Sequence, residues 1–170
     1  VIVTHQHPDH IDHERLPILM AANPKARLIV ESMTYGLLRD RGGPDAEELV
    51  SGQPFALGEL TVYPVGQHHA VIYADIPRID NTGVVFRAPG EPSLFHPGDA
   101  IDADPGPVDL LAVPINAPWC ALKETIDFVR RIEPGAIVPI HDGLVQPRGR
   151  AIYLNQLRDH GRAPVRDLAG

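Results

Sequence analysis

Short apolar runs alternate with polar stretches along the whole chain, and their periods predict strands and helices in turn. Apolar runs predict buried strands at 1–3, 27–30, 108–113 and 136–139. Alternating apolar and polar positions predict a hairpin over 55–65 and a strand pair at 82–88 and 93–95. Apolar positions three and four residues apart predict helices at 14–20, 34–41, 122–132 and 151–160. This order predicts an α/β domain.

The densest cluster of polar residues follows the first apolar run directly. Positions 5–10 are His-Gln-His-Pro-Asp-His. Imidazole and carboxylate groups bind first-row metals, and they are costly to bury unpaired. Residues two apart on an extended segment point to the same side, so His5 and His7 can bind one metal. Asp9 and His10 lie beyond a proline that turns the chain, where they can face a second metal. The two metals of such hydrolytic sites lie about 3.5–4 Å apart. The alternative is a solvated, charged loop.

This cluster resembles the H-x-H-x-D-H signature of the metallo-β-lactamase superfamily, and three later motifs extend the resemblance in that family's order. Gly66-Gln67-His68-His69 offers a further histidine, His96-Pro97-Gly98-Asp99 offers an aspartate, and Pro139-Ile140-His141-Asp142 offers a last histidine. Each motif follows a predicted strand. Four motifs in order are far more specific than one, and together they cover nearly the whole chain.

The resemblance implies an αββα sandwich, with two mixed β-sheets face to face and helices outside. It also implies two divalent metal ions. The implied ligands are His5, His7 and His69 for the first ion and Asp9, His10 and His141 for the second, with Asp99 bridging both. Position 69 stays open toward His68, because neighbours on a strand face opposite ways and only one can reach the metals.

The resemblance further implies a metal-dependent hydrolase in which a metal-bridging hydroxide attacks a small ester, lactone or phosphodiester. Bound divalent ions lower the pKa of a water from 15.7 to about 7 and stabilise charge that develops during the reaction. Asp9 and Asp99 flank the expected hydroxide and are the candidate catalytic residues. Zinc suits imidazole and carboxylate ligands first, and manganese or iron can use the same set. The alternatives are a metal-binding but inactive module, or a phosphodiesterase or nuclease of the same superfamily.

Polar residues near the four motifs are candidates for orienting the metal ligands. A ligating histidine usually donates its other N–H to a carboxylate or a carbonyl. The candidates are Asp12, His13, Asp80, Asn81, His96 and Asp142. The single cysteine, Cys120, follows Trp119 ahead of a predicted helix, and we interpret it as structural.

Composition and charge agree with a globular enzyme domain. The chain has 170 residues, 44% of them hydrophobic, which is enough for one sizeable core. Fifteen basic against 22 acidic residues give a net charge of −7. No basic run appears, so we expect no nucleic-acid partner. Two bound cations would still attract a small anionic substrate. The sequence leaves the oligomeric state open.

The chain opens with Val1, inside the first predicted strand, whereas members of the family carry several strands before this motif. We therefore expect residues 1–170 to form a single domain that lacks its first strands. No apolar run approaches the length of a membrane span. One cysteine cannot form an intramolecular disulfide, which favours a reducing compartment. We expect a cytoplasmic location.

Overall fold

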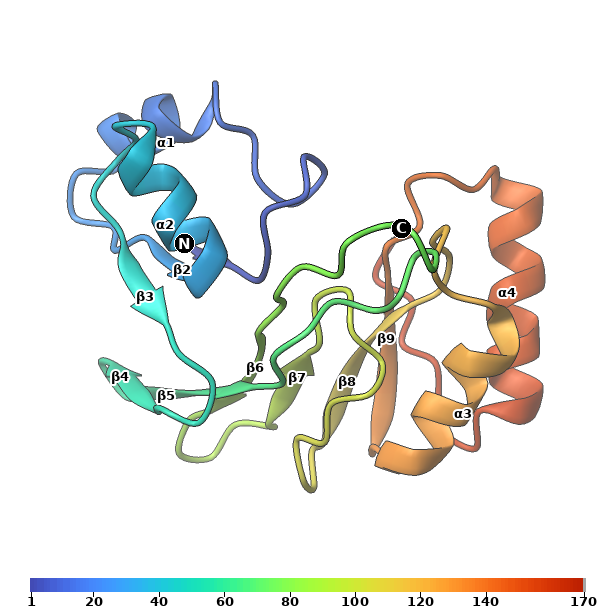
Figure 1. Ribbon diagram of the computed structural model, residues 1–170. Coiled ribbons are helices and arrows are strands. Elements are labelled where there is room, and N and C mark those ends of the chain that lie inside the picture. Colours follow the sequence, from blue (N-terminus) through green and yellow to red (C-terminus); the bar gives the residue numbers. More distant parts are fainter. Residues whose placement is uncertain (170) are drawn as a thin grey trace.

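Two β-sheets lie between two pairs of helices in the computed structural model, which describes residues 1–169 (Figure 1). The smaller sheet contains β1 (Ile2–Val3), β2 (Ile29–Glu31) and β3 (Glu47–Leu49), in that order and parallel. The larger sheet contains β4 (Phe55–Leu57), β5 (Leu60–Val65), β6 (Gly83–Arg87), β7 (Leu94–His96), β8 (Leu110–Pro114) and β9 (Ala136–Ile140). Its pairs are antiparallel from β4 to β7 and parallel from β7 to β9.

Four helices cover the outer faces of these sheets. They are α1 (Leu16–Ala22), α2 (Ser32–Asp40), α3 (Leu122–Ile132) and α4 (Pro147–His160). Helices α1 and α2 accompany the smaller sheet, and α3 and α4 cover β8 and β9 (Figure 1). The predicted αββα sandwich is confirmed. The larger sheet is mixed, whereas the described strands of the smaller sheet pair only in parallel, because helical crossovers connect them.

Three apolar clusters fill the spaces between the four layers. On β2, Val30 packs toward α1 and α2, while its neighbour Ile29 packs against the larger sheet through Val62 and Val84. This is the two-residue alternation of a strand that is buried on both faces. The third cluster joins the larger sheet to α3 and α4, and its fully buried members include Phe95, Leu111, Ile137 and Leu157.

The predicted elements correspond to the observed ones with small shifts at their ends. Helix α3 has the predicted bounds, because Thr125, Phe128, Val129 and Ile132 form one buried stripe at helical spacing. Helix α4 begins at Pro147 rather than residue 151, which suits the fixed φ of proline in a first turn. Strand β3 was not predicted. Of its residues Glu-Glu-Leu only the leucine is buried, so it carries no apolar pattern.

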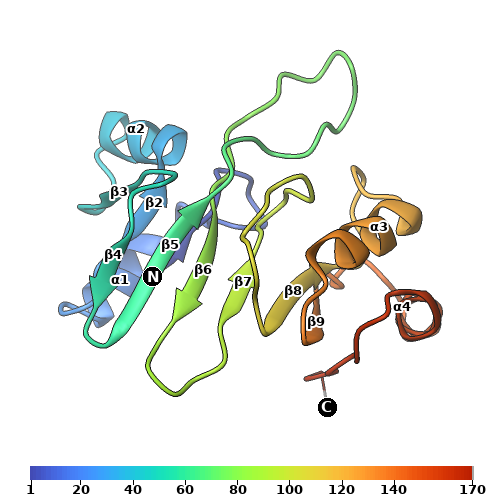
Figure 2. The same ribbon diagram turned by 90° about the horizontal axis from the view of Figure 1, so that it is seen from below.

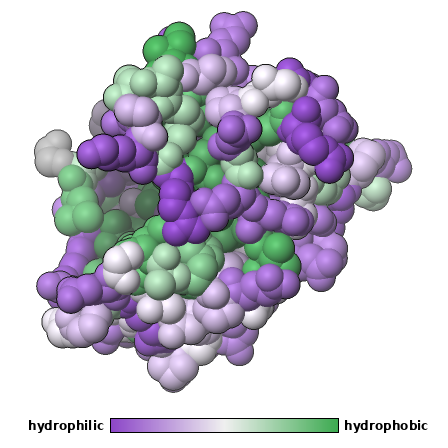
Figure 3. All heavy atoms as spheres, turned by 90° about the vertical axis from the view of Figure 1, so that its left-hand side faces the viewer, coloured by the Kyte–Doolittle hydropathy of each residue, from purple (hydrophilic) through white to green (hydrophobic). Residues whose placement is uncertain are grey.

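The polar motifs converge at one end of the sandwich. The long connection between β5 and β6, residues 66–82, extends beyond the strand ends in Figure 2. The face on the α1 and α2 side shows hydrophilic side chains mixed with smaller hydrophobic patches (Figure 3). Over residues 1–169, no helix combines the length and hydrophobicity that crossing a membrane requires.

Candidate metal centre

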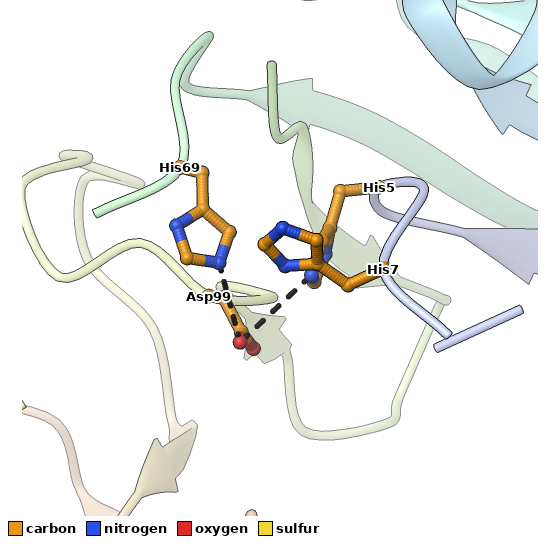
Figure 4. Close-up of side chains that lie close together, drawn as sticks. All are labelled: His5, His7, His69 and Asp99. Carbon is orange, nitrogen blue, oxygen red and sulfur yellow. Dashed lines mark ion pairs between the residues drawn. The ribbon is translucent and has the colours of Figure 1, made fainter. Parts of the chain in front are cut away.

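The structure brings together all seven predicted ligand residues. They form two groups, one of His5, His7, His69 and Asp99 and the other of Asp9, His10 and His141. Within each group the potential ligand atoms lie within 4.8 Å of one another. Figure 4 shows the first group, in which the imidazoles of His5 and His7 from one segment and of His69 from another surround the Asp99 carboxylate. The structure thus assembles candidate metal-binding groups from residues up to 136 positions apart, the difference between 141 and 5.

The secondary structure explains this convergence. The segment with His5 and His7 directly follows β1, and His69 lies in the long connection after β5. Asp99 follows β7, and His141 follows β9. Strands β1, β7 and β9 therefore deliver their ligands at the ends of strands, where a rigid scaffold positions loop residues. A backbone hydrogen bond from the Ala70 N–H to the Asp99 carbonyl, 2.8 Å long, fixes two of these segments together.

Asp99 belongs to the first group and also faces imidazoles of the second. Its Oδ2 atom is 3.3 Å from Nε2 of His141, 3.5 Å from Nε2 of His69 and 3.8 Å from Nε2 of His5. Its Oδ1 atom is 3.1 Å from Nε2 of His10. Two of these imidazoles belong to the first group and two to the second. The carboxylate is therefore placed to contact ligands of both groups.

Several of these atoms are buried without a hydrogen bond. Among the described residues, Nε2 of His5, His69 and His141 and Oδ1 of Asp99 have no partner with hydrogen-bond geometry. A buried polar atom that lacks a partner costs about 1–3 kcal/mol. Four such atoms that face one another fit metal coordination, which satisfies imidazole and carboxylate lone pairs together. The donor set of the site therefore fits divalent cations.

The backbone fixes the orientation of two imidazoles. Nδ1 of His69 donates to the carbonyl of Ala70 over 2.6 Å, and Nδ1 of His141 donates to the carbonyl of Asn116 over 2.7 Å. A carbonyl only accepts, so Nδ1 carries the proton in each ring. In the neutral imidazole the lone pair then lies on Nε2, which points at Asp99. This is the usual arrangement behind a metal ligand.

Burial and charge shift the titration of the two groups in opposite directions. Burial, together with the neighbouring His10, lowers the pKa of His5 to about 3. The facing Asp99 carboxylate raises the pKa of His141 to about 9. Burial alone would raise the pKa of Asp99, but the imidazoles of His10, His141 and His69 hold it well below its usual range. The centre thus combines an ionised carboxylate with a neutral, buried His5.

Gly98 and Asn81 hold the Asp99 loop in place. Gly98 has φ of +63°, a left-handed conformation that suits glycine, and a Cβ there would lie 2.9 Å from the Thr4 side chain. The fully buried Asn81 accepts a hydrogen bond from the Asp99 N–H over 2.9 Å and donates to the Pro97 carbonyl over 2.8 Å. Asn81 therefore orients Asp99 by holding the backbone of its loop rather than by contacting a ligand side chain.

Trp119 is a contact of the centre that the sequence did not reveal. Its buried indole N–H donates to Oδ2 of Asp99 over 3.0 Å. Its ring also meets His69 and His141 edge to face, with centroids 5.7 and 6.1 Å apart. A buried tryptophan needs an acceptor for its N–H, but nothing local in the sequence says which. Cys120, beside it, lies in the apolar cluster around Trp119, in agreement with a structural role.

Among the other residues predicted to orient the metal ligands, His96 lines a cavity beside the centre. The rest make their contacts away from the ligand side chains. Half-exposed His68 pairs with Asp80 over 3.2 Å and is not in either ligand group, whereas His69 is. Asp12 accepts from the N–H groups of Glu14 and Arg15 in a turn before α1, and no contact with a ligand was found in the described chain. Asp142 accepts from Nε of Arg150 over 2.6 Å. His13 belongs to neither ligand group of the described residues.

Comparison with known proteins agrees with this geometry. The model of a family described as "Beta-lactamase superfamily domain" matches residues 1–141. The chain belongs to the metallo-β-lactamase superfamily. This membership confirms the resemblance of the four motifs, and the match spans all seven residues of the two groups.

The alignments with individual relatives cover most of this chain. It is 41% identical to Protein Rv0786c of Mycobacterium tuberculosis over 160 residues, which cover 94% of the chain and 74% of the relative. It is 25% identical to a UPF0173 metal-dependent hydrolase of Methylobacterium nodulans over 156 residues, covering 84% and 65%. The crystal structure of a candidate metal-dependent hydrolase from Parabacteroides distasonis superposes with a TM-score of 0.73 and 20% identity, covering 98% of this chain and 74% of that one. The name of the Methylobacterium relative supports the expectation of a metal-dependent hydrolase, and the structural likeness supports the fold.

Proposed function

We propose that this protein is a binuclear metal-dependent hydrolase of a small ester, lactone or phosphodiester. The observation that carries the proposal is the convergence of four imidazole Nε2 atoms, from both ligand groups, within 4 Å of the Asp99 carboxylate. His5, His7 and His69 would hold one cation, and Asp9, His10 and His141 the other. Asp99 would bridge them.

Two divalent cations bound here would supply hydroxide at neutral pH and would polarise a carbonyl or phosphoryl oxygen. The residues of the chain perform the remaining tasks. Asp99 brings negative charge between two sets of imidazoles, and its loop is fixed by Asn81 and by the Ala70 N–H. Asp9 is the most exposed ligand candidate, with 63% of its side chain accessible, so its carboxylate can orient a water and accept its proton.

Zinc is the metal that we propose first. The two groups contain five imidazoles and two carboxylates, and such a set suits zinc, while manganese or iron can occupy it as well. Four ligands around the first position match the tetrahedral preference of zinc. We further propose that the protein acts in the cytoplasm, since its one cysteine cannot form an intramolecular disulfide. We also propose a small-molecule substrate rather than nucleic acid, since the net charge is −7.

The experiment that tests the proposal combines metal analysis with turnover. Protein purified without added metal is analysed for its metal content and then assayed with a generic ester, a lactone and a phosphodiester. We expect two cations per chain and turnover that a chelator abolishes and added zinc restores. Metal binding that raises the melting temperature without any turnover would instead indicate the inactive module.

A further inference from the structure

A cavity of about 470 Å³ opens beside the second ligand group. Asp9, His10 and His141 form one side of it. The rest of its described wall consists of His96 on β7, Ile140 on β9, and the Gly143-Leu144 pair that follows His141. None of the described residues that line this cavity is an arginine or a lysine. The protein therefore supplies no permanent positive charge to a molecule bound there.

Two guanidinium groups that contact the segments carrying His69 and His141 are already paired. Arg150 donates to Asp142 over 2.6 Å and makes two further hydrogen bonds of 2.7 Å to Asp167. Arg78 donates to the carbonyl of His69 and to Asp102 over 3.0 Å. Bidentate recognition of a phosphate requires such a guanidinium to be free. Both groups instead stabilise the segments that carry the histidines.

The segments that carry His69 and His141 both expose apolar side chains close to these histidines in the chain. Leu144, three residues after His141, is 73% exposed and lines the cavity. Val71, two residues after His69, is 60% exposed. Its neighbours Ala70 and Ile72 pack against the Trp119 cluster, so the loop is anchored while Val71 faces outward. Exposed apolar groups beside a polar centre are typical of a binding site for an apolar ligand.

His96 adds one neutral donor to this cavity. The Gly98 N–H donates to Nδ1 of His96 over 3.1 Å, so the proton of the neutral ring lies on Nε2. Burial lowers the pKa of His96, which keeps the ring neutral. Its Nε2 has no hydrogen-bond partner within residues 1–169 and is not among the fully buried atoms that lack one. A neutral N–H on a cavity wall suits a carbonyl or ester oxygen.

We propose that the cavity binds a neutral substrate with an apolar body, a carboxylic ester or lactone rather than a phosphodiester, and that His96 donates a hydrogen bond to its oxygen. This assignment rests on the proposed hydrolase function. The wall formed by Ile140 and Leu144 contacts the apolar part of the substrate. A phosphodiester would bring a negative charge that only the metals, and no described residue of the wall, would balance.

The test uses metal-loaded protein and p-nitrophenyl esters of acetate, butyrate and hexanoate, with bis(p-nitrophenyl) phosphate as the charged comparison. Each rate is divided by the uncatalysed rate of the same compound. We expect a larger enhancement for the esters, and a kcat/KM that rises about two- to fourfold per methylene of the acyl chain. Leu144→Ala should remove most of this rise, while Ile152→Ala, an equally apolar exposed change on α4, should preserve it.

Two variants of His96 test the hydrogen bond. His96→Phe fills the space without a donor, and we expect a loss of about two- to 13-fold in kcat/KM for the esters, the value of one net hydrogen bond. His96→Gln keeps an N–H and should retain most of the activity. Both variants should keep the metal content of the parent.

The outcomes separate this assignment from the proposed function. A greater enhancement for the phosphodiester, or ester kinetics that neither His96→Phe nor Leu144→Ala changes, would overturn the neutral-substrate assignment and leave the hydrolase intact. Absence of turnover for every compound, in protein that holds two cations, would overturn both.

Discussion

The two ligand groups of the centre use the same residue types but differ in burial. In the first group His5, His69 and Asp99 are at most 2% exposed, and His7 is partly exposed. In the second, the side chains of Asp9, His10 and His141 are 63%, 18% and 12% exposed. The first group lies inside the sandwich, and the second borders the cavity. For the proposed binuclear centre, we expect the buried group to retain its cation and the accessible group to meet the substrate.

Electrostatics strengthens the contrast. Burial holds the pKa of His5 at about 3, so its lone pair is free at any physiological pH. The Asp99 carboxylate raises the pKa of His141 to about 9, so this ring is protonated at pH 7 in the metal-free protein. A metal ligand must be deprotonated. A cation would therefore bind the first group without displacing a proton from His5, whereas at the second group it would displace one from His141.

Replacing Asp99 should impair both groups at once, and we expect it to have the largest effect on activity and metal content. Asp99→Asn removes the negative charge that faces imidazoles of both groups. We expect kcat/KM to fall by roughly a hundredfold to a thousandfold, as when one group that stabilises developing charge is removed. Metal content should fall below one cation per chain. Asp127→Asn, on the exposed face of α3, is the control and should match the parent. A variant that keeps two cations and full activity would contradict the central position of Asp99.

Removing the Trp119 hydrogen bond should weaken both groups without removing a ligand. Trp119→Phe keeps an aromatic ring but loses the N–H donated to Asp99. Partners behind a ligand are worth about ten- to a hundredfold in metal affinity, and we expect a loss in that range by competition with a chromogenic chelator. The absorption of the cobalt-substituted protein should also shift.

Cys120→Ala changes the same apolar cluster and leaves this hydrogen bond in place, so it should retain parental metal affinity. Equal losses in both variants would assign the effect to packing rather than to the indole N–H.

The pH dependence of metal binding should differ between the groups. Between pH 7 and pH 9 the apparent affinity of the second group should rise about tenfold per unit, because one proton leaves His141. Calorimetry in buffers of different ionisation enthalpy measures that proton. The first group should release no proton from His5 above pH 6.5.

The metal-free protein should show the opposite trend. The folded pKa of His141 lies above that of an unfolded chain, about 6.5, so its ion pair stabilises the fold fully below pH 6.5 and less as pH rises through 9. Thermal melts of the metal-free protein from pH 7 to 9 should therefore show falling stability. A constant melting temperature would contradict the raised pKa.

Staged chelation should reveal a difference in cation affinity between the two groups, the smallest of the expected effects. The second group has three candidate ligands and an exposed Asp9, against four ligands in the first. We expect its cation to dissociate first, with an affinity at least about tenfold lower, or about 1.4 kcal/mol. Dialysis against increasing chelator, followed by metal analysis, should show an intermediate with one cation. Simultaneous loss of both would indicate one cooperative site.

Much of the fold was predictable because its strands and helices follow simple periods. Helix α3 was predicted within its bounds, since its buried stripe repeats at helical spacing. Strand β3 was missed, because Glu47 and Glu48 are exposed and tertiary pairing with β2 makes this segment a strand. Helix α1 begins at Leu16, two residues later than predicted, because Asp12 organises a separate turn before it.

The ligand residues were predictable because the chemistry of metal binding limits which side chains can serve. Histidine and aspartate at positions 5 to 10, followed by three motifs in order, named all seven residues that the structure brings together. Alternation on an extended segment predicted only that one of His68 and His69 reaches the metals, and the structure places His69 in a ligand group. The assignment of each residue to a metal stays a prediction.

The sequence by itself determined the family, the layered α/β fold and the identity of the clustered residues, because these depend on local periodicity and on the order of motifs. Only the tertiary structure decided that Trp119 donates to Asp99, that Asn81 fixes its loop, and that His96 faces a cavity without arginine or lysine in its described wall. Contacts of this kind join residues that are distant in the chain. Their geometry depends on how the sheets pack, and no local pattern encodes it.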